Sequence, residues 1–516
     1  MISFSFTFLK KYSSVLPVCL GSLLLLPFAQ PAGAKTIHMG TGTGTINLDS
    51  MHGLEDGDTV IIKQGTYSGG TISNLTGITI LPEAPGVTFN GSIHIGKNNK
   101  VTIDGTAPVS SEDGTAPQDD NAKDAKPQGP VYGYTFAGFD REHAFVPTWN
   151  NTDLTIKGIW FKGVSAVDGS GGLMTYDGKS ETTLFYNLTL DTVKLTGRAT
   201  IYDGTWEPPH TYKNVNIGMT MKNIIFINDC TQENTKFFGN SIYKMVADHW
   251  IIIGPTINLH DVGIIVLMGN GTFKNIYRNG GWGYIARIWN VSLNEVADSY
   301  FYNVIDVNST RYGTIDTRVD PTLLAEKASI PVLGGNMHIF NVTSGNKYDV
   351  TNEYITPLLM LGSMVGNDGH QYTTEIKNCI SFHPIGSLIQ NNSQGTPKAT
   401  LSVSNNMEVP GGAPHTNYKG GALPDGYFID PIKFYPTRGG KLIGAGVSVP
   451  QVTTDIYGNP RTDTNDVGAV QHTEENSEAA DKADEFLGET LKMLIDNPTM
   501  NSAAGDINPI APTNSK

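Results

Sequence analysis

Short segments that alternate apolar and polar residues recur along the chain, and most of them end at a glycine or an asparagine. The first few follow one another at intervals too short for helices between them. Each segment predicts a half-buried strand of about three to five residues. The segments are residues 58–65, 78–81, 92–96, 100–105, 154–161, 220–228 and 374–382.

Strands this short cannot bury enough apolar surface alone, so they must stack on their neighbours. The arrangement that satisfies them all is an all-β fold, a single-stranded right-handed parallel β-helix (a solenoid), in which each coil adds a rung to one continuous core. The 58 glycines and 28 prolines suit its many tight corners. The residues predicted to point into this core are Ile61, Ile80, Ile103, Ile156, Ile225 and Ile376.

Three regions interrupt the repeats. Residues 105–130 lack apolar periodicity and predict a flexible surface excursion, and residues 318–331 predict a short helix or loop. Residues 473–496 predict an amphipathic helix, which either covers the open end of the solenoid or docks a partner. The predicted organisation is a signal peptide (1–34), the β-helix (35–472), and an acidic amphipathic helix with a disordered tail (473–516).

The first 34 residues are typical of a cleavable secretory signal peptide. Lys10 and Lys11 precede an apolar stretch, and Ala32-Gly-Ala34 supplies small residues for cleavage before Lys35. No later stretch has the roughly 18 apolar residues of a membrane span. We therefore expect export to the periplasm or the extracellular space. The two remaining cysteines, Cys230 and Cys379, are predicted to be separate buried thiols.

The charge balance excludes nucleic acid as a partner. Without the two lysines of the signal, 33 basic residues (35 − 2) stand against 49 acidic ones, a net of about −16. Nucleic acid requires a basic stripe, which the sequence lacks. Much of the acidic excess lies in residues 474–489, so the solenoid body is closer to neutral.

Both ends of the predicted solenoid resemble proteins with the pectate lyase-like β-helix fold. Gly57-Asp-Thr-Val-Ile-Ile-Lys-Gln-Gly-Thr-Tyr-Ser-Gly69 is similar to their first coil, and residues 455–461 with 466–469 are similar to the closing segment of secreted members. With the internal coils, the resemblance covers roughly residues 36–471. It implies a secreted, carbohydrate-active protein, but that superfamily includes lyases, hydrolases, epimerases and adhesins. The galacturonase motifs are absent as a set.

The densest chemistry lies between residues 244 and 320. The segments 263–267, 283–287 and 313–317 are predicted to be equivalent strands of three consecutive coils, so that their outward side chains form one patch. Elimination from a uronic-acid polymer needs a cation for the carboxylate, a base and an acid. The predicted catalytic residues are Arg287, His260 and Tyr284, and Trp250 is a further candidate for stacking on sugar. The predicted substrate-binding residues are Arg318, Arg278, Lys244, Trp282, Trp289, Asp316 and Asp261.

Three functions fit these residues, and the first is preferred. A polysaccharide lyase uses Arg287 on the carboxylate and His260 or Tyr284 on the protons. A glycoside hydrolase of the same fold would pair Asp261 with Asp316, or Asp316 with Asp320. A non-catalytic polysaccharide-binding protein or adhesin would need neither set. We expect a monomer without a required cofactor, with calcium as the candidate ion. The structural alternative is that these aromatics, histidines and arginines only fill and pair at coil corners.

Overall fold

The structure is a computed structural model, and it describes most of the chain from residue 33 to residue 491. The predicted signal, most of the excursion at 105–130, the segment 318–331 and Cys230 lie outside the described residues. The described ranges are 33–49, 53–106, 130–139, 143–163, 171–176, 185–197, 199–204, 216–227, 242–254, 266–280, 284–288, 296–308, 314–317, 335–345, 358–361, 371–383, 388–391, 400–410, 423–430, 432–461, 465–473, 486–488 and 490–491.

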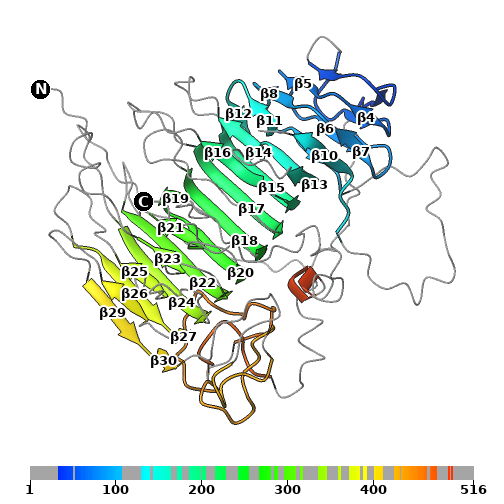
Figure 1. Ribbon diagram of the computed structural model, residues 1–516. Helices are drawn as coiled ribbons and strands as arrows, with labels where there is room; N and C mark the ends of the chain where they lie inside the picture. Colours follow the sequence, from blue (N-terminus) through cyan, green and yellow to red (C-terminus); the bar gives the residue numbers. More distant parts are fainter. Residues whose placement is uncertain are drawn as a thin grey trace, which may run out of the picture.

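The fold is a right-handed parallel β-helix, as predicted (Figure 1). Pairing between the named strands is parallel, and each strand pairs with its counterparts in the coils before and after it. The short sheet contains β2 (Ile46–Leu48), β5 (Gly70–Ser73), β8 (Ile93–Gly96), β11 (His143–Pro147), β14 (Gly171–Tyr176) and β16 (Ala199–Gly204).

The long sheet has 24 strands and runs the length of the solenoid. Its members are β1 (Thr36–Met39), β3 (Thr59–Ile62), β4 (Thr66–Tyr67), β6 (Thr79–Pro82), β7 (Val87–Phe89), β9 (Thr102–Asp104), β10 (Tyr134–Phe139), β12 (Asn151–Thr152), β13 (Thr155–Gly163), β15 (Phe185–Thr196), β17 (Asn216–Ile227), β18 (Ile242–Gly254), β19 (Val266–Gly269), β20 (Thr272–Gly280), β21 (Ala286–Ile288), β22 (Ala297–Val307), β23 (Ile315–Asp316), β24 (Gly335–Gly345), β25 (Leu359–Leu361), β26 (Thr373–Lys377), β27 (Ile380–His383), β28 (Ile389–Asn391), β29 (Thr400–Ser404) and β30 (Met407–Pro410).

A column of left-handed residues divides the long strands into two limbs. Asn275, Asn303 and Asn341 have φ of 53–54° and occupy equivalent places in β20, β22 and β24. Asparagine tolerates this conformation better than other residues with a side chain, so it bends the strand at low cost. Its amide also bonds along the column, as in Asn303 Nδ2 to Asn275 Oδ1 at 3.2 Å. The strand before the bend is called the first limb and the strand after it the second limb.

The interior is filled by alternate residues of both limbs, as with Leu188 and Leu190 on the first limb of β15 and Val193 and Leu195 on its second limb. On the first limb, Ile80, Ile103 and Ile156 lie in register in the main core cluster, and Ile376 belongs to the same cluster, as predicted. Two predictions of direction were wrong. Ile61 and Ile225 alternate with core neighbours such as Val60 and Ile224, so they face away from that core. A shift of one residue along a strand reverses the face.

Ile225 is buried on the outer face because the C-terminal segment covers the second limbs of the middle coils. Ile225, Ile251 and Tyr277 form a second apolar cluster with Tyr457, Leu487 and others. Figure 1 shows this segment (orange), with the short helix (red), beside the ends of β18, β20, β22, β27 and β30. The helical residues 486–488 and 490–491 therefore pack on the side of the solenoid, and the prediction that they cover its open end was wrong.

Arg461 links the C-terminal segment to the bend of the long sheet by hydrogen bonds. Its guanidinium donates to Asn303 Oδ1 at 3.2 Å and to the carbonyls of Gly468 and Ala469 at 3.0 Å each. Burial lowers the pKa of Arg461 to about 10, and Asp455 and Asp466 oppose that shift. Residues 455–461 and 466–469 thus hold the C-terminal segment on the long sheet.

Cys379 is a buried free thiol, as predicted. Burial raises its pKa to about 12, which makes a nucleophilic role unfavourable at neutral pH.

Candidate functional site

The described parts of the three strands predicted at 263–317 are β19, β21 and β23, and these pair in consecutive coils. Arg287 of β21 is in register with Val266 of β19 and Asp316 of β23. The structure describes the backbone of Arg287 but not its side chain. His260, Asp261, Trp282, Trp289 and Arg318 also lie outside the described residues, so the patch as a whole stays a prediction.

Several members of the predicted patch are in the wrong place for contact with a polymer. Arg278 is fully buried and forms a two-pronged ion pair with Asp306, with nitrogen–oxygen distances of 2.7 and 2.9 Å. Tyr284 and Asp316 are buried as well. Trp250 lies in the core and donates to the carbonyl of Met221 at 3.0 Å. Lys244 is exposed, at a left-handed bend (φ 58°).

The outer face of the first limb carries two straight columns of polar side chains. One column is threonine in eight of nine successive coils, from Thr36 to Thr272, and Val246 interrupts it. The other alternates in charge over six coils. Its members, in register, are Asp104, Lys157, Asp191, Lys222, Asp248 and Lys274.

The charged column neutralises itself. Lys157 Nζ lies 2.8 Å from Asp104, and Lys274 Nζ lies 3.1 Å from Asp248. Burial would raise the pKa of Asp248, but bonds from His249, with Lys274 and Asn275, lower it to about 2. This stretch of the outer face is therefore polar, with equal numbers of acidic and basic side chains in the column.

The residue types in both columns change at β22, β24 and β26. The threonine column continues as Tyr300, His338 and Glu375, and the charged column as Tyr302, Phe340 and Lys377. His338 Nδ1 lies 3.2 Å from Glu375 Oε2, and its Nε2 lies 3.8 Å from Asp298 Oδ1. The Tyr300 ring stacks on the imidazole with centroids 4.6 Å apart. We call Tyr300, His338, Glu375, Lys377 and Asp298 the imidazole cluster.

Neighbouring groups shift the pKa values of Glu375 and Tyr300 in this cluster. Burial alone would raise the pKa of Glu375, but hydrogen bonds from Lys377 (2.5 Å) and His338 outweigh it and lower the pKa. Burial raises the pKa of Tyr300, and the carboxylates Asp298 and Glu375 raise it further. At neutral pH the cluster thus holds an ionised carboxylate against an imidazole, and a protonated phenol above that ring.

The surroundings of the imidazole cluster hold it in place. Asn336 donates to Asp298 at 2.8 Å and accepts from the backbone of Thr373 at 3.0 Å. Val449 and Val452 of the C-terminal segment pack on Phe340 beside Tyr300 and Tyr302. Side-chain exposures of 21% for His338 and 30% for Lys377 leave these groups accessible from the outer face.

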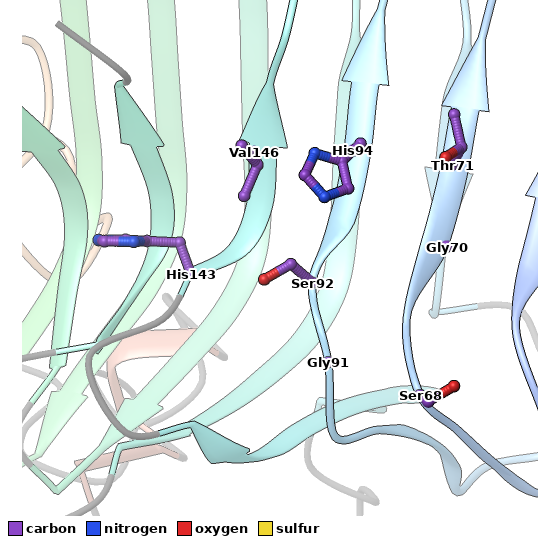
Figure 2. Close-up of a pocket in the computed structure, with 8 residues that line it drawn as sticks. All are labelled: Ser68, Gly70, Thr71, Gly91, Ser92, His94, His143 and Val146. Carbon is purple, nitrogen blue, oxygen red and sulfur yellow. The ribbon is translucent and has the colours of Figure 1, made fainter.

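A groove on the outer face of the short sheet is a second candidate site. Figure 2 shows Thr71, His94 and Val146 on the neighbouring strands β5, β8 and β11, where they are in register. With Ser68, Ser92 and His143 they line an open groove of about 630 Å³. The described residues that line it supply hydroxyls and imidazoles, with no lysine, arginine, aspartate or glutamate among them.

No group of three or more histidine, cysteine, aspartate or glutamate side chains in the described ranges is placed to hold a metal ion. Within the same ranges, no helix is long and apolar enough to cross a membrane.

The imidazole cluster was not predicted from the sequence, because its successive members are about 37 residues apart. A signal was available. Tyr300, His338 and Glu375 each precede a left-handed asparagine by three residues, namely Asn303, Asn341 and Asn378. Alignment of the coils on these asparagines places the three side chains in one column.

No protein-family model matches the sequence, and no curated protein matches it. Among solved structures, the chain is similar to one described as the crystal structure of pectate lyase Pel9A. The two share 12% identity over 82% of this chain and 90% of that one, with a TM-score of 0.36. A likeness at this level carries no argument about activity, and the fold rests on the strand register described above.

Proposed function

We propose that the protein is an exported polysaccharide lyase that cleaves a uronic-acid polymer by β-elimination at the imidazole cluster. The observation that supports this most is His338, which is held by Glu375 and stacked under Tyr300 on the flat outer face of three consecutive coils. An extended polymer fits such a face better than it fits an enclosed pocket. The carboxylate next to the imidazole is the arrangement that orients a general base.

In this proposal His338 removes the proton from the sugar carbon beside the carboxylate (C5). The electrons of that bond form the C4=C5 double bond, and the C4–O bond to the leaving sugar breaks. Tyr300 gives its hydroxyl proton to the leaving oxygen, because its raised pKa keeps it protonated at neutral pH. A proton returns from His338 to Tyr300 after release, so the site is restored without another reactant.

Two charged groups assist that step. Glu375 stabilises the imidazolium that forms on His338, because its own pKa is lowered and it stays ionised. Lys377 has three donors and uses one on Glu375, which leaves others for the substrate carboxylate. Arg287 and His260 stay candidates from the sequence. The hydrolase alternative loses Asp316, which is buried.

The test is to incubate the mature protein with a panel of uronic-acid polymers and to follow the ultraviolet absorbance of the unsaturated product alongside new reducing ends. We expect both signals. Reducing ends without absorbance would indicate a hydrolase, and neither signal would indicate a binding protein.

His338→Ala should lower turnover by about 10²-fold or more, the scale of a lost general base. His94→Ala, which removes an exposed histidine from the short sheet, is the matched control and should keep wild-type turnover. Equal turnover in the two variants would contradict the assignment.

A further inference from the structure

Two lysines flank one indole on the outer face of the second limbs of β13 and β15. Lys162 Nζ lies 3.9 Å and Lys194 Nζ 4.6 Å from the centroid of the Trp160 ring. The indole N–H donates to Thr196 Oγ1 at 3.0 Å, which fixes the ring. All four side chains are half-buried, and they are in register as Trp160 with Lys194 and Lys162 with Thr196.

These lysines differ from three lysines on the first limb. Lys157, Lys274 and Lys377 each have a carboxylate within about 3 Å. In the described part of the chain, no carboxylate lies within ion-pair distance of Lys162 or Lys194. Burial lowers the pKa of Lys194, and the charge of Lys162 lowers it further. Two like charges therefore share one half-buried site, and an anion between them would relieve both the repulsion and the desolvation.

We propose that Lys162 and Lys194, held against Trp160, form a binding site for an acidic sugar unit, in which the two ammonium groups hold its oxyanion. The oxyanion is a uronate carboxylate or a sulfate ester, since both present the same charge-assisted acceptors. The inference rests on the proposed function only in taking the ligand to be an acidic polysaccharide.

The site stands apart from the imidazole cluster. Six coil steps of about 4.8 Å separate β13 from β24, so Trp160 and His338 are about 29 Å apart along the solenoid axis. A long polymer spans this distance and a disaccharide does not. The site should therefore add affinity for long chains and leave the reaction of short ones unchanged.

The test measures binding to full-length protein that carries His338→Gln, so that cleavage does not interfere. The probes are polygalacturonate, dextran sulfate and unmodified dextran, each at low and high salt, by isothermal titration calorimetry. We expect one or both acidic polymers to bind, with an affinity that falls as salt rises, and dextran not to bind. The acidic polymer that binds more tightly identifies the oxyanion.

Adding Lys162→Gln and Lys194→Gln should weaken that binding about tenfold or more, the scale of two lost charge-assisted contacts. The matched control is Lys97→Gln, which removes the lysine 4.7 Å from the ring of exposed Trp149 and should bind as before. Circular dichroism checks that each variant is folded.

Unchanged affinity in the double-lysine variant, or no binding of either acidic polymer, would overturn the inference. If the lysine substitutions weaken binding but the wild-type protein gives no unsaturated product from uronic-acid polymers, the proposed function is overturned and this inference stands.

Discussion

Replacement of Arg278 by methionine should destabilise the protein by about 3–5 kcal/mol. Arg278 and Asp306 are both fully buried and share two short bonds, so the change leaves an uncompensated carboxylate in the interior. A loss of that size is a large fraction of the 5–15 kcal/mol that typically stabilises a domain. Protonation of Asp306 limits the loss, and it should therefore be smaller in acid.

Urea unfolding followed by circular dichroism measures this loss for Arg278→Met, Asp306→Leu and the double variant. The double variant should recover most of the stability, because two apolar side chains replace a buried ion pair at little cost. From the sequence, Arg278 was predicted to bind the substrate instead. Unchanged unfolding of Arg278→Met together with a raised KM for an acidic polymer would refute the structural role.

Three further predictions concern stability and chemistry. Asp248 has a pKa of about 2 in the folded protein, against an ordinary 3.8, so its ionised form stabilises the fold by about 2 kcal/mol above pH 4, and this contribution is lost as the pH falls towards 2. The Asp248→Asn variant should therefore lose less stability than the wild type between pH 5 and pH 2, as measured by urea titration. Equal losses in the two proteins would contradict the pKa shift. Deletion of residues 473–516 removes the buried Leu487 and Leu491, and should cost about 3 kcal/mol or more and lower the melting temperature; unchanged melting would indicate that the helix does not stabilise the solenoid. Glu375→Gln keeps the shape of the side chain but removes the charge that stabilises protonated His338, so kcat should fall about 10²-fold while the protein stays folded. A full kcat would exclude Glu375 from the reaction.

The sequence predicted the solenoid because alternation of apolar and polar residues marks each strand, whatever lies on its outer face. It did not predict that Ile225 lies on the outer face of its strand and is buried there, because the residues that cover that face, such as Tyr457 and Leu487, come more than 200 positions later in the chain. Alternation is ambiguous wherever both faces of a strand are buried.

The candidate site was harder to predict for a related reason. The region 244–320 is rich in arginines and aromatics, but burial decides their roles, and Arg278 and Trp250 point into the solenoid. The imidazole cluster instead comes from one ordinary residue per strand in three strands. Only the register between coils reveals it, and the left-handed asparagines set that register.

The most direct test of the account is a crystal structure of the His338→Gln protein with a bound uronic-acid oligosaccharide long enough to cross several coils. We predict that the sugar lies along the outer face of β22, β24 and β26, with its C5–H against residue 338, a carboxylate near Lys377 and the leaving oxygen near Tyr300. A sugar bound in the groove of the short sheet, or at 263–317, with the imidazole cluster empty, would contradict the central claim.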